Sequence, residues 1–379
     1  MTNPSPNISS VLEQWLARRL PNVSNRPNTL PRIPSLRVPE TGASNETLLF
    51  DAHWQGEHGE VVEQSLVARL QPRCSSVFSE YDLYKQYRIM ECLQETTLPV
   101  PQLVGYESNG ELLGTPFYVM RYLPGRVISE NPPYHLGGWF KEELDDSQRE
   151  RIWNEAVDAI ATIHRLDWQA LSMEFLLRPE LGDTPLQQEL NEYQSYVDWI
   201  EGRAGRNYPD LHIALDWLQA NQPENEPTAL CWGDARAGNL LIDMGTEISA
   251  ILDWEMARLG NPVHDISWWL ALDYALGEGL APLVGGAVTP VSGLPGREQV
   301  IQRWEQQSGF SARDIEYYDM LCTFEFAAVM ASQAYVGVEQ GQYTWEMNVD
   351  YCNPSTLGFH REMAKRGLPI ANPIPLPTR

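Results

Sequence analysis

Two carboxylates and an amide follow one another near the middle of this 379-residue chain. Asp234 and Asn239 are separated by four residues, and Asp253 lies fourteen residues beyond Asn239. A phosphoryl-transfer site needs one carboxylate to orient a hydroxyl nucleophile, and an Asn–Asp pair of oxygen ligands to hold Mg²⁺ on the phosphates. The three residues therefore indicate phosphoryl-transfer chemistry, with Asp234 as the base and Asn239 and Asp253 as metal ligands.

Three short strand-like segments surround these residues, at 230–232, 239–243 and 249–253. A D-x-x-x-x-N sequence, a pair of strands and a further Asp follow the order found in protein kinases. Asp and Asn also occur in turns for local hydrogen-bonding reasons, so the spacing alone is explained as well by a plain hairpin. The flanking strands, and Asp253 at the end of the second one, favour the functional interpretation.

Residues farther upstream could hold phosphates. Gly42, Ser44 and Asn45 lie in a turn between two predicted strands, where backbone N–H groups can approach phosphate oxygens closely. Such a turn on its own is more often purely structural. Arg69, on a predicted strand, could bind the α- and β-phosphates, with Glu80 on the following helix fixing its orientation. The alternative for this pair is a surface salt bridge or no contact at all.

Other polar residues near the motif have two interpretations. Arg236 could neutralise the transferred phosphoryl group or pair with one of the nearby acids, and the sequence does not separate these roles. Asp265 precedes an apolar helix and is predicted to cap that helix or to brace the catalytic loop. His164, at the end of another predicted helix, is expected to be structural. Glu189 and the other acids of residues 185–201 are expected on a solvated helix face.

The composition restricts the partners and the compartment. The formal charge is −24 and the pI is near 4.6, so the chain is predicted to bind neither nucleic acid nor a membrane. Five scattered cysteines without C-x-x-C spacing argue against a zinc site or a disulfide framework and for a reducing compartment. The first residues lack the basic and apolar regions of a secretory signal, so a cytoplasmic location is expected.

The hydrophobic pattern divides the chain into three parts. Residues 1–35 predict a short helix and an extended arm, residues 36–122 a small nucleotide-binding lobe, and residues 123–379 a helical lobe with the catalytic loop and acceptor site. Within the large lobe, Ser147 and Glu150 predict a capping box that opens a helix. The predicted fold class is α+β, with an antiparallel sheet in the small lobe. The other predicted helices span 8–20, 75–94, 185–203, 209–220, 262–277, 297–307 and 311–340, and the small-lobe strands span 36–38, 46–52, 64–70 and 117–120.

These segments resemble the aminoglycoside phosphotransferase family, also called the phosphotransferase enzyme family, within the protein-kinase-like fold. The resemblance extends over roughly residues 36–345. Many members carry His where this chain has Trp232, and kinases commonly carry Lys where it has Arg69. Both forms are similar to the kinase-like domains found with acyl-CoA dehydrogenases. The matching segments are Gly42–Glu46, Val67–Leu70, Gly114–Met120, Leu123–Gly125, Trp232–Asn239, Asp253–Glu255 and Leu259–Pro262.

The resemblance implies a nucleotide, ATP or GTP, bound with Mg²⁺ near Met120 and Tyr122, and a small hydroxylated acceptor over the helical lobe. By matching position, the resemblance makes Asp234 the catalytic base, Asn239 and Asp253 metal ligands, and Arg69 the cation that binds phosphate. The chemistry of these residues indicates the same roles. The sequence thus predicts a small-molecule kinase that transfers a γ-phosphoryl group to a hydroxyl and exists as a monomer or homodimer. Residues 125–230, where acceptor contacts are expected, do not identify the acceptor.

Two other classes of protein remain open at this point. A non-catalytic nucleotide-binding pseudokinase would share the fold without turnover, although the presence of Asp234, Asn239 and Asp253 together speaks against it. A metal-dependent hydrolase could use the same carboxylates, but it would have no use for the N-terminal hairpin, Arg69 and Glu80.

Overall fold

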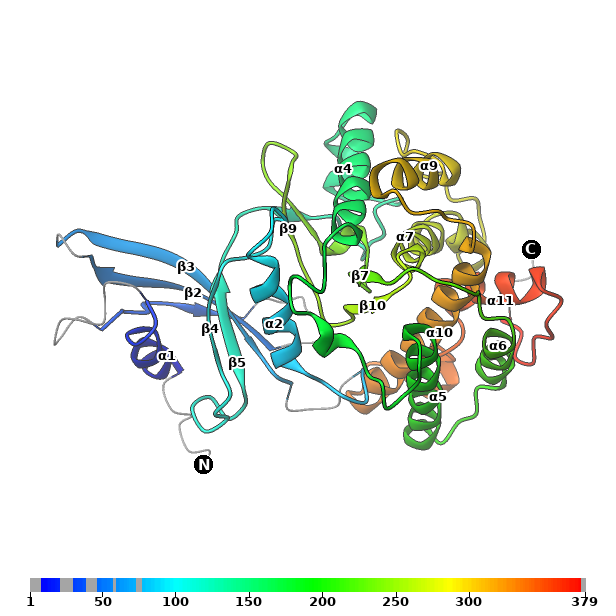
Figure 1. Cartoon of the computed structure of the whole chain (residues 1–379), viewed down its shortest axis with the longest axis horizontal. Coiled ribbons are helices and arrows are strands. Elements are labelled where there is room, and N and C mark those ends of the chain that lie inside the picture. Colours follow the sequence, from blue (N-terminus) through cyan, green and yellow to red (C-terminus); the bar gives the residue numbers. More distant parts are fainter. Residues whose placement is uncertain (1–7, 21–29, 39–45, 57–58, 73–76, 376–379) are drawn as a thin grey trace. The chain divides into compact units, whose positions relative to one another are not determined.

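The computed structural model describes residues 8–20, 30–38, 46–56, 59–72 and 77–375 (Figure 1). The chain divides into two compact units. One consists of Met1–Ser76 and Glu80–Pro124, and the other of Val77–Ser79 and Gly125–Arg379. The first unit is built on an antiparallel sheet, whereas the second is mainly helical.

The sheet of the first unit has five strands in the order β1-β2-β3-β5-β4, and all neighbours are antiparallel. Strands β2 and β3 form a long hairpin that pairs without a register shift from Glu46 opposite Leu70 to Gln55 opposite Val61. The buried end of β3 also pairs with β5, so β3 is the central strand. The strands span β1 (Leu36–Arg37), β2 (Glu46–Gln55), β3 (Val61–Leu70), β4 (Leu103–Glu107) and β5 (Phe117–Arg121).

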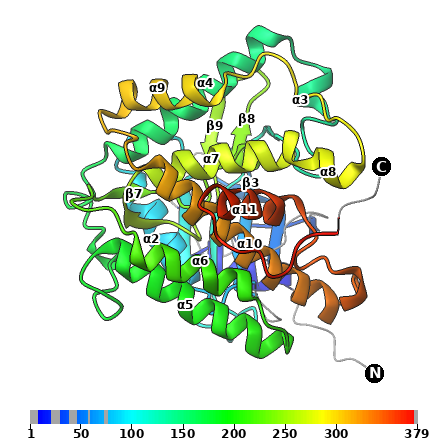
Figure 2. The same ribbon diagram turned by 90° about the vertical axis from the view of Figure 1, so that its right-hand side faces the viewer.

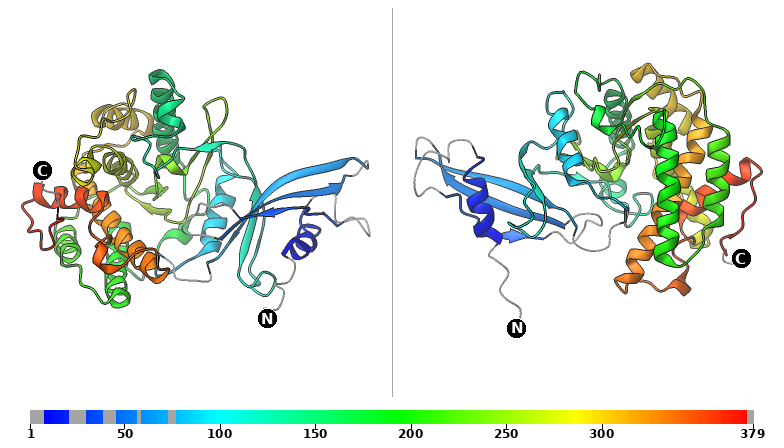
Figure 3. Two further views of the ribbon diagram at one scale, coloured as in Figure 1. Left: turned by 180° about the vertical axis from the view of Figure 1, so that it is seen from behind. Right: turned by 60° about the horizontal axis from the view of Figure 1, so that its bottom comes forward.

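Helix α1 (Ile8–Leu16) covers one face of this sheet (Figure 3). Leu12 and Leu16 are fully buried, and the Trp15 ring lies 5.2 Å from that of Phe117 in the sheet core. The Trp15 Nε1–H group donates to Glu107 at 2.9 Å, which satisfies the one polar atom of the buried indole. The apolar stripe of α1 therefore completes the core of the first unit.

Helix α2 (Leu83–Leu93) is shorter than the helix predicted over 75–94. It begins after Asp82, whose carboxylate caps the helix by accepting from the backbone N–H of Lys85 at 2.9 Å. Glu80 thus precedes α2 instead of lying on it, which corrects the predicted placement. The apolar pattern is compatible with either start, and the capping carboxylate decides between them.

The second unit contains most of the helices (Figures 1 and 2). Helices α7, α10 and α11 pack together, and α5 packs beside α6. The predicted helices of this unit are confirmed to within a few residues at each end, whereas α11 was not predicted. The longer helices span α4 (Asp146–His164), α5 (Pro185–Ala204), α6 (Pro209–Ala220), α7 (Val263–Leu276), α9 (Arg297–Ser308), α10 (Ile315–Glu339) and α11 (Pro354–Lys365), and the short ones α3 (Trp139–Glu142) and α8 (Ala281–Val284).

The capping box of α4 lies two residues earlier than predicted. Asp145, not Ser147, is the N-cap: its carboxylate accepts from Gln148 N–H at 2.8 Å, and the Gln148 side chain accepts from Asp145 N–H at 3.0 Å. The buried Arg149 guanidinium bonds to the carbonyls of Phe140 and Lys141, which anchors this first turn. The predicted box with Glu150 at its third position is therefore wrong.

Helix α10 is long and apolar enough, by length and composition, to cross a membrane. Of its most apolar window, 61% is buried, against α5, α6, α7 and α11 among others. Central helices of helical cores pass the same test, and the packing of α10 is that of such a helix.

Five short strands of the second unit carry the motif residues. Strands β6, β8 and β9 form one antiparallel sheet and β7 pairs with β10 in another. The loop between β7 and β8, residues 232–239, is called the catalytic loop below. The strands span β6 (Arg126–Val127), β7 (Ala229–Cys231), β8 (Leu240–Ile242), β9 (Ile248–Ile251) and β10 (Arg258–Gly260).

Candidate active site

The catalytic loop is held by one face of α7. Asp265, in the first turn of that helix, accepts backbone N–H groups from Trp232 at 2.6 Å and from Gly233 at 2.9 Å. Trp268, one turn later, donates its Nε1–H to Asp234 Oδ1 at 3.1 Å. Because residues i and i+3 lie on the same side of a helix, α7 fixes three successive loop residues.

Asp265 is the brace that the sequence predicted, and it is not the N-cap of α7. Its carboxylate is completely buried and accepts from His164 Nε2 at 3.0 Å. The other His164 nitrogen, Nδ1, accepts from Trp304 Nε1–H at 2.9 Å, so His164 is the neutral tautomer with its proton on Nε2. Burial alone would raise the pKa of Asp265, but the hydrogen bond from His164 and the nearby His264 imidazole outweigh burial and lower it. His164 is thus structural, as expected.

Gly233 is required by the backbone of the catalytic loop. Its φ of +85° lies in the left-handed region, and a Cβ there would come within 2.1 Å of the Met256 carbonyl oxygen. The close approach places the loop against the segment that follows Asp253.

Asp234 is 8% exposed and accepts hydrogen bonds on both of its oxygens. Besides Trp268 on Oδ1, Oδ2 accepts from Arg236 Nε at 2.7 Å and from Asn239 Nδ2 at 2.7 Å. Three donors from different positions fix the plane of this carboxylate, which is what a general base needs in order to meet a hydroxyl in one orientation.

The two predicted metal ligands flank the β8–β9 pair: Asn239 directly precedes β8, and Asp253 follows β9 by two residues. The Leu252 N–H group, beside Asp253, donates to the Asn239 carbonyl at 2.9 Å, and Trp232 Nε1–H donates to the Leu252 carbonyl at 2.9 Å. The Asn239 amide nitrogen is committed to Asp234, so the amide oxygen is the atom left to act as a metal ligand. An amide oxygen and a carboxylate are ligands that suit Mg²⁺, and the donor set therefore fits this ion.

Asp253 has a positive φ of +59°. Asp and Asn adopt this left-handed conformation more readily than other non-glycine residues, because their short polar side chains can bond locally. Two residues after β9, Asp253 thus has a backbone conformation of the kind that clusters at functional sites.

Arg236 pairs with two carboxylates. It binds Asp234 through Nε, and its Nη1 forms an ion pair with Glu130, a residue that the sequence analysis did not single out. Burial alone would lower the pKa of Arg236, but Asp234, Glu130 and the more distant Asp253 outweigh burial and raise it, so the guanidinium stays charged. Arg236 therefore pairs with nearby acids, which was one of the two predicted roles. It also lies beside the predicted base, where the other role, neutralising a transferred phosphoryl group, stays a prediction.

The other predicted site residues lie in the first unit. Arg69 on β3 donates to Thr47 Oγ1 at 3.4 Å, and its pairing with Glu80 stays a prediction. Met120 is on β5, and the half-exposed Tyr122 follows it. Gly42, Ser44 and Asn45 lie outside the described residues. The structure thus brings together Asp234, Arg236, Asn239 and Asp253, all within the second unit.

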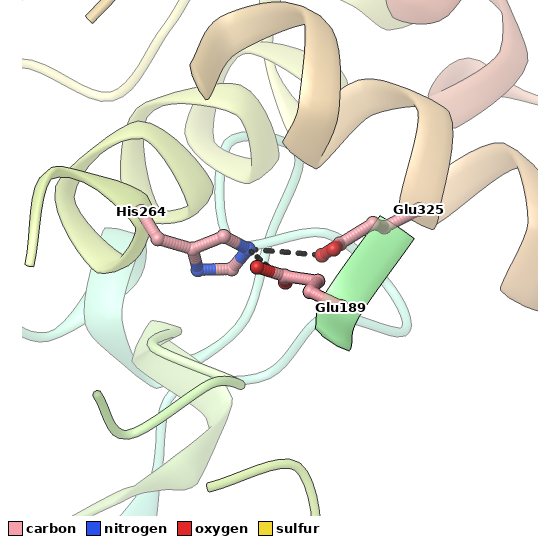
Figure 4. Close-up of side chains that lie close together, drawn as sticks. All are labelled: Glu189, His264 and Glu325. Atoms are coloured by element: carbon pink, nitrogen blue, oxygen red, sulfur yellow. Dashed lines mark hydrogen bonds and ion pairs between the residues drawn. The ribbon is translucent and has the colours of Figure 1, made fainter. Parts of the chain in front are cut away.

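A second group of ionisable residues is buried under α7 (Figure 4). Ligand atoms of Glu189 (α5), His264 (α7) and Glu325 (α10) all lie within 4.8 Å of one another, as in a metal site. Arg258 of β10 occupies the space between them: its Nη2 contacts His264 Nε2 and lies 2.6 Å from Glu189 and 3.3 Å from Glu325. The Arg258 guanidinium therefore makes the contacts that a metal ion would make at this position. Glu189 is 8% exposed, so its predicted position on a solvated face is wrong.

This buried group, called the Arg258 cluster, makes stability depend on pH. Burial and the Glu325 carboxylate outweigh Arg258 and raise the pKa of Glu189 to about 8. Between about pH 4.3, the pKa of a glutamate in the unfolded chain, and about pH 8, Glu189 is protonated in the folded state and ionised in the unfolded state. The free energy of unfolding is therefore greatest below this pH range and falls as the pH rises through it.

We expect Glu189→Gln, which mimics the protonated acid, to make the free energy of unfolding depend less on pH. Urea unfolding from about pH 5 to about pH 9 should show a smaller loss of stability in the variant, with each unit of pKa difference worth about 1.4 kcal/mol. Glu192→Gln, on an exposed position of the same helix, is the control. Parallel pH profiles for Glu189→Gln and the wild type would contradict this account.

Comparisons with known proteins show which family this chain belongs to. The family model described as Phosphotransferase enzyme family matches residues 37–297, more than half of the chain. Curated relatives include acyl-CoA dehydrogenase family member 10 of Mus musculus, 26% identical over 324 residues, and family member 11 of Gallus gallus, 24% identical over 370 residues. The matches cover 80% and 95% of this chain but only 29% and 42% of those proteins, so the chain spans less than half of their length.

Solved structures share the fold. A Ralstonia eutropha JMP134 protein assigned as an aminoglycoside phosphotransferase has a TM-score of 0.68 at 20% identity, over 94% of this chain and 98% of that one. An ethanolamine kinase of Plasmodium vivax has a TM-score of 0.53 at 10% identity, over 86% and 81%. An ADP-bound aminoglycoside phosphotransferase has a TM-score of 0.52 at 13% identity, over 94% and 98%. The α+β, two-lobed kinase-like fold predicted from the sequence is thus confirmed, and the chain belongs to the phosphotransferase enzyme family.

Proposed function

We propose that this protein is a kinase that transfers the γ-phosphoryl group of ATP or GTP, bound with Mg²⁺, to a hydroxyl group of a small acceptor. The observation that carries the proposal is the arrangement around Asp234: a carboxylate fixed by Trp268 and Asn239, beside the Asn239–Asp253 pair of oxygen ligands. The cytoplasmic location, with neither nucleic acid nor membrane as a partner, remains part of the proposal and rests on the composition alone.

In this proposal Asp234 accepts the proton of the acceptor hydroxyl as the new oxygen–phosphorus bond forms. Trp268 and Asn239 keep the carboxylate in one orientation, so little rearrangement is needed when the acceptor arrives. Arg236 stands next to the base and offers a permanent positive charge to the transferred group. When bound, Mg²⁺ supplies charge neutralisation of the phosphate oxygens, and Asn239 and Asp253 would hold it.

The metal assignment is tested by Asp253→Asn, which removes the charge but tolerates the left-handed backbone. We expect the variant to bind ATP in the presence of Mg²⁺ at least about tenfold more weakly, which is about 1.4 kcal/mol less ligand stabilisation in a thermal-shift titration. Asp243→Asn, in the β8–β9 turn, is the matched control. An ATP-induced shift equal to that of the wild type would refute the role of Asp253.

The acceptor is a hydroxylated small molecule in this proposal. The names of similar proteins suggest the compounds to test first: aminoglycosides, amino alcohols such as ethanolamine, and hydroxylated acids or their acyl thioesters. A coupled measurement of ADP release with each compound would rank them. A product that retains the phosphoryl group as a phosphate ester identifies the true acceptor.

A further inference from the structure

Glu130 reaches the catalytic loop from a separate segment of the second unit. Strand β6 pairs with β8, with Val127 opposite Leu241, and this pairing carries the residues after β6 alongside the loop. Glu130 Oε1 accepts from the Gly238 N–H group at 3.3 Å, and Oε2 forms the ion pair with Arg236. The contact is therefore bidentate across the loop, with one oxygen on the backbone and the other on the guanidinium.

The glycine at position 238 makes room for this carboxylate. A Cβ there would lie 2.7 Å from Glu130 Oε1 and 2.9 Å from its Cδ, closer than such atoms approach in folded proteins. Gly238 is not among the residues with a positive φ, so a side chain there would displace the Glu130 carboxylate without straining the backbone. The present position of Glu130 thus depends on the glycine at position 238.

The two carboxylates determine which edge of the Arg236 guanidinium is used. A guanidinium has five N–H donors in a fixed plane. Nε is committed to Asp234 Oδ2 at 2.7 Å and Nη1 to Glu130. Nη2 has no hydrogen-bond acceptor among the described residues, and the side chain is 30% exposed. Glu130 and Asp234 together therefore leave Nη2 as the edge of Arg236 that can meet an anion.

We propose that Glu130 is a positioning residue for phosphoryl transfer: it holds Arg236 so that its Nη2 edge faces the transferred phosphoryl group. This inference rests on the proposed function. In the step, the acceptor oxygen forms a bond to the γ-phosphorus and its proton passes to Asp234. The bond from that phosphorus to the bridging oxygen breaks, and the electron pair leaves with the nucleoside diphosphate. Arg236 and Glu130 transfer no proton.

The first test uses the protein without nucleotide. NMR of arginine side chains should show a protected Nε–H resonance of Arg236, identified by its loss in Arg236→Gln. We expect Glu130→Gln to shift this resonance and to speed its exchange with solvent at least about tenfold, because one of two charged partners is lost. Glu143→Gln, which alters a glutamate paired with Arg126 outside the site, is the matched control and should leave the resonance unchanged. An unchanged Arg236 signal in Glu130→Gln would overturn the inference.

The second test measures Mg²⁺-dependent hydrolysis of ATP, with water as the acceptor. We expect Glu130→Gln to lower kcat about 10- to 100-fold with KM for ATP within about threefold, as misplacement of a catalytic group does. Because Glu130 acts through Arg236, the double variant with Arg236→Gln should be no slower than Arg236→Gln alone. Losses that multiply in the double variant would overturn the inference in favour of a purely structural role. Absence of hydrolysis in the wild type would instead count against the proposed function, and the NMR experiment would still decide the Glu130–Arg236 contact.

Discussion

Replacing Asp234 by Asn will lower phosphoryl transfer about 10²- to 10⁴-fold, the range that a general base contributes. The side chain loses the negative charge that attracts the acceptor proton. Its new NH₂ group is a hydrogen-bond donor, and it faces a donor from Trp268, Arg236 or Asn239 in place of the acceptor that those groups need. Binding of ATP with Mg²⁺ should stay within about threefold of the wild type, because the proposed ligands Asn239 and Asp253 are retained. Initial rates of ADP release, compared with calorimetric titration of ATP, separate the two effects.

Asp216→Asn, an exposed position on α6, controls for the change of charge and should leave both quantities unaltered. A thermal melt of Asp234→Asn shows whether the variant is folded. Transfer by the Asp234→Asn variant at the wild-type rate would mean that another group is the base, and the assignment of the catalytic loop would have to be abandoned.

Replacing Arg258 by Met will destabilise the second unit by about 3–5 kcal/mol, the cost of leaving buried charges without their partner. The guanidinium contacts Glu189, His264 and Glu325, which come from three different helices and are each less than a tenth exposed. Burial alone would raise the pKa of Glu325, but Arg258 and His264 outweigh burial and lower it. The variant therefore leaves this buried carboxylate with His264 as its remaining charged partner. Urea unfolding at neutral pH measures the loss.

The surface pair of Arg303 and Asp158 provides a contrast. Its geometry is good, with contacts of 2.7 and 2.6 Å, but both side chains are 36% exposed, and Arg303→Met should cost less than about 1 kcal/mol. Adding Glu325→Gln to Arg258→Met removes the buried negative charge that has lost Arg258 and should recover part of the stability. Equal losses for Arg258→Met and Arg303→Met would show that the Arg258 cluster does not act as a buried ion network.

The sequence predicted those parts of the site that are local in the chain. Asp234 and Asn239 are five positions apart in one loop, and the β8–β9 hairpin returns the chain beside Asn239 just before Asp253. Helices such as α5 and α10 were predicted because an apolar stripe at helical spacing is a strong signal over many residues. The family resemblance rested on the same local segments.

The rest of the site depends on contacts between distant segments. Trp268 lies 34 positions from Asp234, and Glu130 lies 106 positions from Arg236. Trp304 carries no sequence signal that links it to His164, 140 positions away. An acid such as Glu189 on an amphipathic helix looks solvated, because the pattern cannot show that an arginine from another strand will meet it.

The start of α4 illustrates a different limit. The segment Asp145 to Glu150 contains two overlapping capping signatures, one from Asp145 to Gln148 and one from Ser147 to Glu150. The buried guanidinium of Arg149, bonded to carbonyls of the preceding turn, selects the earlier one. Local propensity allowed both starts, and tertiary packing decided between them.

The central claim, that the catalytic loop moves a phosphoryl group from a nucleotide, is tested most directly by single-turnover reaction with ATP labelled in its γ-phosphate. Excess protein, with and without Mg²⁺, would be mixed with the labelled nucleotide and sampled over time, for the wild type, Asp234→Asn and Asp253→Asn. We predict Mg²⁺-dependent transfer of label to water by the wild type and loss of that transfer in both variants, with nucleotide binding weakened only in Asp253→Asn. Tight Mg²⁺-dependent binding of ATP, with the wild type releasing label no faster than Asp234→Asn, would contradict the claim and identify the protein as a pseudokinase.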